Sequence, residues 1–236
     1  MPAARTSVAQ RFEIFDHTVA AMGARLLKVR APEQMMTALR WGMDESDKAY
    51  AQTPAGVRAK VACRAGCAAC CHVPVDVQAH EAFFAADHIL VNFAPAALAA
   101  VIARLARHRA RVAALGEGER PRSRRPCALL QAGSCSIYAG RPGTCRSHHS
   151  SDAALCDANQ ADASVNVTKA YIPALRARMF AVMLGVDEAM ETAGYDERCY
   201  DFGSALHEAL TDSRCLLRWL RRHAAFPDSC LADAGA

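Results

Sequence analysis

The amino-acid sequence predicts a mainly α-helical fold with at most a short strand. Apolar residues recur at helical spacing towards both ends of the 236-residue chain. Between them, residues 116–159 are rich in Gly, Pro, Ser, Arg and Cys and have little apolar period. Such a long irregular segment is uncommon inside a domain unless it is functional or is held by something other than an apolar core. We therefore expect helices from both ends to pack around or beside a loop-rich centre.

The first sixty residues indicate two helices that pair as a hairpin. Helical spacing connects Phe12, Phe15, Val19, Met22, Leu26 and Leu27, and Pro32 is followed by a second set, Met35, Met36 and Leu39. Methionine at helical spacing, here including Met43, is typical of a core, so we do not interpret these residues as soft-metal ligands.

One short strand and two helices are predicted after residue 72. Alternation in Val73–Gln78 favours a strand. A helical pattern then runs over His80–Phe93 and stops before Pro95, and a second one runs over about residues 96–115. We expect Gly116 to end this helix in the left-handed conformation.

The C-terminal part is again helical in pattern. Pro173 suits the first turn of a helix whose apolar face runs from Leu175 to Leu184 and which Gly185 follows. The last helix is expected over residues 205–222, capped by Ser204, with Leu206, Leu210, Leu216, Leu217 and Leu220 on one side. We divide the chain into an N-terminal helical segment (1–60), a cysteine-cluster region (61–160) and a C-terminal helical segment (161–236), and expect one globular unit.

Composition argues against several classes of protein. The formal net charge is only +4 and aromatic residues make up 6% of the chain, whereas nucleic-acid-binding proteins usually combine a broad basic face with aromatics. The one dense basic run contains Arg120, Arg122, Arg124 and Arg125 and is equally explained as a solvated loop. The longest uncharged stretch, residues 89–103, is too short to span a bilayer. Because the N-terminus also lacks the apolar core of a signal peptide, we expect a cytoplasmic protein without a membrane partner.

The stretch CRAGCAACCHVP places four thiols within nine positions, at Cys63, Cys67, Cys70 and Cys71. A helix would put all four on one face, and a metal-knuckle turn around Gly66 would also make them converge. Packing as a small buried hydrophobe is common for one cysteine but does not explain this grouping.

Four more thiols, Cys127, Cys135, Cys145 and Cys156, lie in the irregular segment. A segment without an apolar core must recover its ordering entropy in another way, and metal–thiolate bonds do so. Metal ligation therefore explains both groups. Cys199, Cys215 and Cys230 fall outside them and are assigned no role, Cys215 being most simply a core or boundary residue of the last helix.

Thiolates favour Zn²⁺, an iron–sulfur cluster or Cu(I) over hard cations. The steps from Cys63 to Cys67 and on to Cys70 have zinc-knuckle spacing, but the adjacent Cys71 is awkward for a single tetrahedral ion, which slightly favours an iron–sulfur cluster. Two four-ligand centres, and one such centre with the other thiols free, both stay open. His148 is the first further candidate ligand, followed by His72 and His149. The arginines that flank Cys127 and Cys145 are candidates for offsetting thiolate charge: Arg124, Arg125, Arg141 and Arg146.

The pattern C-x3-C-x2-C-C followed by PVDVQAHE, then C-x7-C-SIYAGRPGTCR and Cys156, resembles the YkgJ-type cysteine-cluster family, described as zinc- or iron-chelating proteins. The resemblance covers about residues 61–160, and CSIYAGRPGTCR matches the family's C-S-I-Y-x-x-R-P-x-x-C-R pattern at every fixed position. Where family members often have Pro-Phe, this chain has Ala128 and Leu129. The resemblance implies metal chelation by Cys63, Cys67, Cys70, Cys71, Cys127, Cys135, Cys145 and Cys156.

We therefore expect a metal-binding protein that holds an iron–sulfur cluster or zinc and acts in electron transfer or redox sensing. A related cysteine-cluster region in bacterial flagellin lysine methylases adds a role as an accessory to protein modification, with a protein partner. The alternatives are a structural zinc protein, a metal-free thiol switch, and a thiol-reactive enzyme or metallochaperone using Cys71 beside His72 or Cys145 near His148. Pro142 and Gly143 are expected to make the turn that presents Cys145.

Overall fold

The computed structural model describes residues 8–116 and 118–232 and is mainly helical, as predicted. The elements, in chain order, are α1 (Val8–Leu26), α2 (Pro32–Ala51), α3 (Ala55–Arg58), η1 (Ala69–His72), β1 (Asp76–Val77), α4 (Ala79–Asn92), α5 (Pro95–Ala113), η2 (Arg120–Arg122), β2 (Leu130–Gln131), β3 (Ser134–Cys135), η3 (Tyr138–Gly140), α6 (Gly143–Ser147), α7 (Ala153–Ala161), η4 (Val167–Ala170), α8 (Pro173–Thr192), β4 (Tyr200–Asp201), α9 (Phe202–Thr211), α10 (Arg214–Leu220) and η5 (Asp228–Cys230), where η denotes a 3-10 helix.

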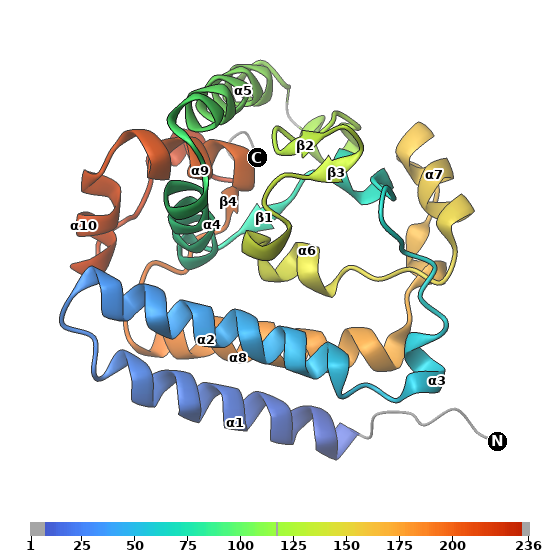
Figure 1. Ribbon diagram of the computed structural model, residues 1–236, viewed down its shortest axis with the longest axis horizontal. Helices are drawn as coiled ribbons and strands as arrows, with labels where there is room; N and C mark the ends of the chain where they lie inside the picture. The colour runs from blue at the N-terminus through green and yellow to red at the C-terminus, as the bar shows by residue number, and fades with distance from the viewer. Residues whose placement is uncertain (1–7, 117, 233–236) are drawn as a thin grey trace.

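Helices α1, α2 and α8 lie side by side and form one layer (Figure 1). The expected hairpin of α1 and α2 is present, but α1 contacts α8 more extensively than it contacts α2. Gly185 makes this possible, because a Cβ at that position would lie 2.8 Å from Thr18 Cβ and 3.0 Å from the carbonyl oxygen of Phe15. The expectation that α8 ends before Gly185 is therefore wrong: the glycine is buried inside the helix, where it admits α1.

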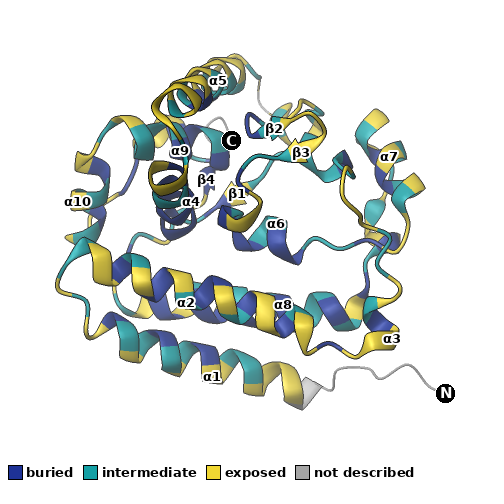
Figure 2. Ribbon diagram, in the orientation of Figure 1, coloured by how far each residue is buried: buried dark blue, intermediate teal, exposed yellow. Residues whose placement is uncertain are grey.

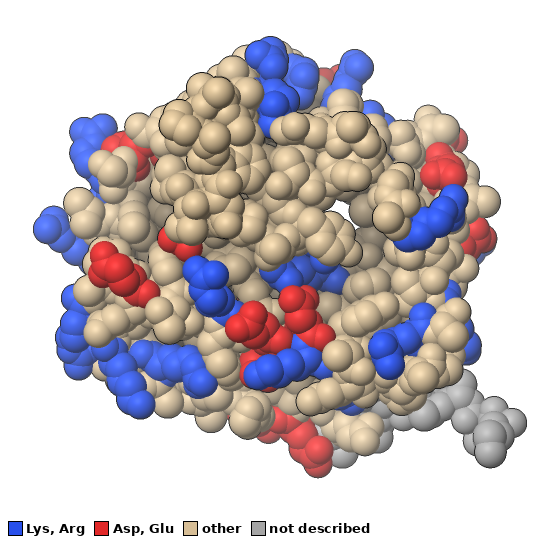
Figure 3. Space-filling model, viewed as in Figure 1, with Lys and Arg blue, Asp and Glu red and all other residues tan. Residues whose placement is uncertain are grey.

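The core of this layer contains the methionines that the helical spacing predicted. Met22 and Met35 are fully buried and Met43 is nearly so. Phe12 and Leu27, which share the predicted apolar pattern, are instead 62% and 77% exposed. Phe12 lies near the start of α1, and Leu27 lies just beyond its last residue. On the face shown in Figure 3, acidic and basic side chains are mixed along the helical layer and not segregated by sign.

A second group of helices consists of α4, α5 and α9, and contact between α2 and α4 joins it to the first. Strands β1 and β4 pair antiparallel beside this group, with Asp76 opposite Asp201 and Val77 opposite Tyr200. The strand expected over Val73–Gln78 is thus only two residues long, and Pro74, which has no N–H to donate, lies outside it. No helix of the described ranges has the length and apolar character required to cross a membrane.

Two predicted helix ends are wrong. Helix α5 ends at a right-handed residue, Ala114, and the Gly116 amide donates instead to Glu119 Oε2 at 2.7 Å, so Gly116 is not a left-handed cap. The last predicted helix is two helices, α9 and α10, because the backbone becomes extended at Asp212. Asp201, not Ser204, caps α9: its carboxylate accepts hydrogen bonds from the Ser204 amide and hydroxyl at 2.9 and 2.8 Å.

Candidate metal centre

The first four predicted ligands lie on a loop and on η1, not on a continuous helix. Gly66 has a φ of 81°, in the left-handed region that glycine adopts readily, so no helix runs through the segment. Turn hydrogen bonds join the Cys67 amide to the Arg64 carbonyl (3.0 Å) and the Cys71 amide to the Ala68 carbonyl (2.9 Å). Of the two geometries that the sequence left open, the turn is therefore the one that forms.

The β2–β3 hairpin brings Cys127 and Cys135 together. Ala132 and Gly133 have φ values of 46° and 75°, and a two-residue hairpin turn of this type requires positive φ at both positions. The Cys127 amide donates to the Cys71 carbonyl at 2.7 Å, which ties the start of the hairpin to η1. The sequence analysis missed this hairpin, and Gly133 was the available signal.

Cys145 lies in α6, the short helix that Pro142 and Gly143 begin. The Gly143 amide donates to Glu81 Oε1 at 2.7 Å, and the Gln78 amide donates to Glu81 Oε2 at 3.0 Å. Burial raises the pKa of Glu81 to about 7. The sequence analysis did not predict this supporting carboxyl, although a glutamate inside the apolar stretch AHEAFF was a signal for it.

Cys156 is one of two buried residues in α7, the other being Asn159. Asp152 caps this helix, since its Oδ1 accepts a hydrogen bond from the Leu155 amide at 3.0 Å. Helix α7 packs against η1 and η4, and its other residues are exposed or partly exposed (Figure 2). Cys156 is therefore the side chain through which α7 meets the other cysteines.

The eight predicted ligands are free thiols, and electrostatic interactions link them in two sets that overlap. Burial, and after it the thiols of Cys63, Cys67 and Cys70, raise the pKa of Cys156. Burial, and after it the thiols of Cys127, Cys70 and Cys135, hold the pKa of Cys145 well above its usual range. Cys70 thus belongs to both sets, and a hydrogen bond with Cys71 is the largest cause of its own raised pKa. We call the set the thiol cluster: Cys63, Cys67, Cys70, Cys71, Cys127, Cys135, Cys145 and Cys156.

The donors of the thiol cluster fit a soft metal. Zinc and iron–sulfur clusters are both bound by thiolates, and eight neighbouring thiols supply more than one ion needs. Burial is the largest cause of the raised pKa values of Cys145 and Cys156, and repulsion between neighbouring thiolates adds to it. A bound cation would offset this repulsion. In residues 8–116 and 118–232 no three His, Cys, Asp or Glu side chains stand arranged to hold a metal ion, so binding requires the side chains to draw together.

Arg141 provides positive charge next to the thiols. Its guanidinium lowers the pKa of Cys70 and of Cys135 against larger effects that raise both, and it lies over the Tyr138 ring, 3.5 Å from the centroid. By contrast, Arg146 pairs with Asp47 at 2.9 Å and Arg124 donates to a backbone carbonyl. Among the flanking arginines, Arg141 is the one placed to offset thiolate charge.

The three candidate histidines pack against other groups. His148 meets the Tyr171 ring edge-on at 5.5 Å, His149 stacks on Tyr50 at 4.9 Å, and His72 Nδ1 lies 3.1 Å from the Ala68 carbonyl. Away from the thiol cluster, Cys215 in α10 is fully buried, as expected of a core residue, and so is Cys230.

The site is that of a metal-binding cysteine protein. Residues 62–171 match the family model CxxCxxCC, described as a "putative zinc- or iron-chelating domain". This match confirms the resemblance to the YkgJ-type cysteine-cluster family, and its description agrees with the expected cofactor, an iron–sulfur cluster or zinc. Between Cys63 and Cys67 the chain has one residue more than the pattern in that name, and Gly66 lies in this interval. Comparison with curated proteins and with solved structures found no match.

Proposed function

We propose that the thiol cluster holds an iron–sulfur cluster and that the protein acts in electron transfer or redox sensing. The observation that carries the proposal is that eight thiols from separate segments interact electrostatically in two sets that share Cys70, whose thiol is hydrogen-bonded to that of Cys71. A single tetrahedral ion uses four thiolates and accommodates adjacent cysteines poorly, whereas an iron–sulfur cluster or two centres use this set better.

The surroundings of the thiol cluster support a redox role. Cys63 is exposed and Cys67 is partly exposed, so one edge of the centre lies near the surface, where a partner protein can exchange electrons with it. Arg141 supplies a nearby positive charge, and charges and hydrogen bonds around thiolates tune the reduction potential of such a centre. When bound, the cluster would supply one-electron chemistry. The eight thiols also favour the reducing cytoplasm, because they would cross-link in an oxidising compartment.

Zinc is the second candidate, favoured by the knuckle spacing of Cys63, Cys67 and Cys70 and by the matched family, which is described as zinc- or iron-chelating. Four thiolates leave no open position for water, so a zinc site here would be structural. A reactive Cys145 has less support, because the pKa of this thiol is raised, whereas a nucleophilic cysteine needs a lowered one.

The test is anaerobic purification followed by measurement of iron, zinc, acid-labile sulfide and the visible spectrum on one sample. We expect iron with matching sulfide and a broad absorbance of the cluster at roughly 400 nm. Colourless protein with stoichiometric zinc would establish the structural alternative. Absence of both metals and of sulfide would refute metal binding altogether.

A matched pair of variants tests which thiols take part. Cys145→Ser removes a thiol of the cluster, and Cys230→Ser removes a buried thiol outside it. We expect the metal content per folded protein to fall in the first variant and to stay unchanged in the second. Equal metal content in both would exclude Cys145 from the ligand set.

A further inference from the structure

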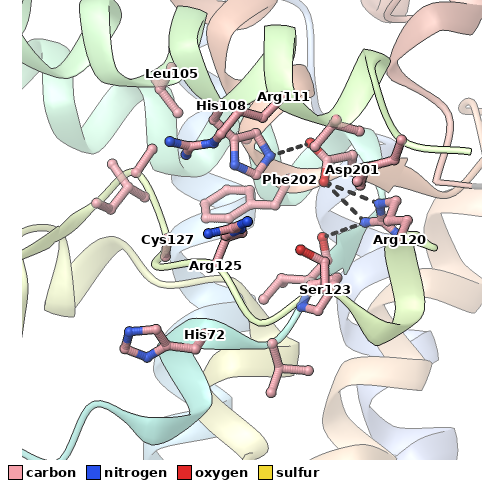
Figure 4. Close-up of a pocket in the computed structure, with 18 of the residues that line it drawn as sticks. His72, Leu105, His108, Arg111, Arg120, Ser123, Arg125, Cys127, Asp201 and Phe202 are labelled. Carbon is pink, nitrogen blue, oxygen red and sulfur yellow. Dashed lines mark hydrogen bonds and ion pairs between the residues drawn. The ribbon is translucent and has the colours of Figure 1, made fainter. Parts of the chain in front are cut away.

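A pocket of about 430 Å³ opens beside the thiol cluster. Its walls come from the loop before β1, from α5, from residues 120–129 and from the start of α9 (Figure 4). Leu105, Leu129 and Phe202 form an apolar floor and are 0%, 2% and 5% exposed. The volume is in the range of small-molecule sites, which are typically apolar with a few placed polar groups.

Two basic side chains that line the pocket, His108 and Arg120, already have an acidic partner. His108 Nε2 lies 2.8 Å from Asp201 Oδ2, and Arg120 pairs with the other oxygen of the same carboxylate at 3.1 Å. Asp201 thus neutralises charge at one end of the pocket. His108 reaches it because Gly203 has no side chain: a Cβ there would lie 2.3 Å from the imidazole.

The two remaining arginines of the pocket, Arg111 and Arg125, have no such partner among the described residues. Neither guanidinium forms a hydrogen bond or an ion pair with any described residue. Both side chains reach into the space around Phe202 (Figure 4). The pocket therefore combines an apolar floor with two guanidinium groups that no described acidic residue pairs with.

We propose that this pocket binds a small organic anion with an oxyanion head group and an apolar body. Carboxylates and phosphates both match the planar fork of donors that a guanidinium presents, and Arg111 and Arg125 offer two such forks. Leu105, Leu129 and Phe202 would cover the apolar body. The proposal does not depend on which metal the thiol cluster holds.

The test is isothermal titration calorimetry on the metal-loaded, full-length protein with ligands of one chain length. Octanoate and octyl phosphate carry the two oxyanion heads, while 1-octanol and octylamine carry a neutral and a cationic head on the same body. We expect at least one of the two anions to bind, 1-octanol to bind about tenfold more weakly and octylamine not to bind. Failure of both anions to bind, or equal binding of octylamine, would overturn the proposal.

Variants locate the binding. The double variant Arg111→Gln/Arg125→Gln should raise the dissociation constant about tenfold or more, and Val112→Trp, which fills the pocket from its rim, should also weaken binding. Arg107→Gln, on the same helix but outside the pocket, is the control and should bind as the unsubstituted protein does. If the double variant binds as tightly as this control, the assignment is wrong. Metal content, measured on each variant, separates loss of the anion site from loss of the metal centre.

Discussion

The α1–α2–α8 layer and the segment around η1 and α7 are held together by different interactions. In the helical layer, Met22 and Met35 are fully buried and Gly185 brings α1 and α8 into close contact. In α7 the buried side chains are Cys156 and Asn159, and the Asn159 amide donates to the Val165 carbonyl at 2.7 Å. Apolar burial therefore suffices for the helical layer, whereas the segment around η1 and α7 depends on polar contacts and, in our proposal, on a metal.

Removing the metal should separate the two regions most strongly. Helix α7 would lose its attachment to the thiol cluster, while α8 keeps its apolar contacts. A ligand present at about a hundred times its Kd stabilises by about 2.7 kcal/mol, so amide exchange in residues 153–161 should become about a hundredfold faster. Hydrogen–deuterium exchange with and without chelator measures this. An equal loss of protection in α7 and α8 would show that the metal does not stabilise α7 more than α8.

Substitution of Gly185 should damage only the helical layer. In Gly185→Val the new side chain meets Thr18 Cβ and the Phe15 backbone at 3.0 Å or less, which should lower the free energy of unfolding by about 3 kcal/mol. Metal content should not change. Gly23→Ala in α1 is the control: no heavy atom lies within 4 Å of its new Cβ, so it should stabilise by about 1 kcal/mol. Urea unfolding measures both, and a Gly185→Val protein as stable as the original would refute the packing argument.

Glu81 connects α4 to α6, the helix that carries Cys145, and its titration should be visible in the free energy of unfolding. Burial raises its pKa from 4.5 to about 7, so the protonated carboxyl favours the folded state. This contribution is fully present below pH 4.5 and is lost as the pH rises through 7. Between pH 4.5 and 8, the free energy of unfolding of Glu81→Gln should therefore rise by on the order of 3 kcal/mol relative to that of the unsubstituted protein. Parallel pH profiles from urea unfolding would show that Glu81 does not titrate in this range.

Loss of the α7 cap should have the smallest effect. Asp152→Ala removes the acceptor for the Leu155 amide and should cost about 1 kcal/mol of helix stability. If α7 orders together with metal binding, the metal affinity falls about fivefold. Asp157→Ala, an exposed position on the same helix, is the control and should leave the affinity unchanged. Competition with a chromophoric chelator measures the metal affinity of both variants. Equal affinities would show that the ordering of α7 is not coupled to metal binding.

The helical part of the fold could be predicted because apolar period is a local signal. The pattern was sufficient for α1, α2, α4 and α5. The apolar pattern failed where tertiary contacts determine the helix ends. Gly185 resembled a helix end because Thr18, which it contacts, is far away in the sequence. The break at Asp212 was missed because the leucines on either side continue one helical pattern.

The candidate ligands could be named from the sequence, but their arrangement could not. Cysteine grouping and motif resemblance identify residue types, whereas the meeting of Cys156 with Cys63 depends on where α7 packs. The anion pocket left no sequence signal for a related reason. Arg111 and Arg125 belong to separate segments, and only the three-dimensional structure shows that neither has a partner among the described residues.

Cys127 belongs to two sites, since it is part of the thiol cluster and also lines the pocket beside that cluster. Thermodynamic linkage then constrains the two sites. Whatever factor an occupant of the pocket imposes on metal affinity, the metal must impose on the affinity for that occupant. Through the shared side chain of Cys127, the concentration of a small molecule would thus change the metal occupancy of the protein. The metal concentration would in turn change the occupancy of the pocket.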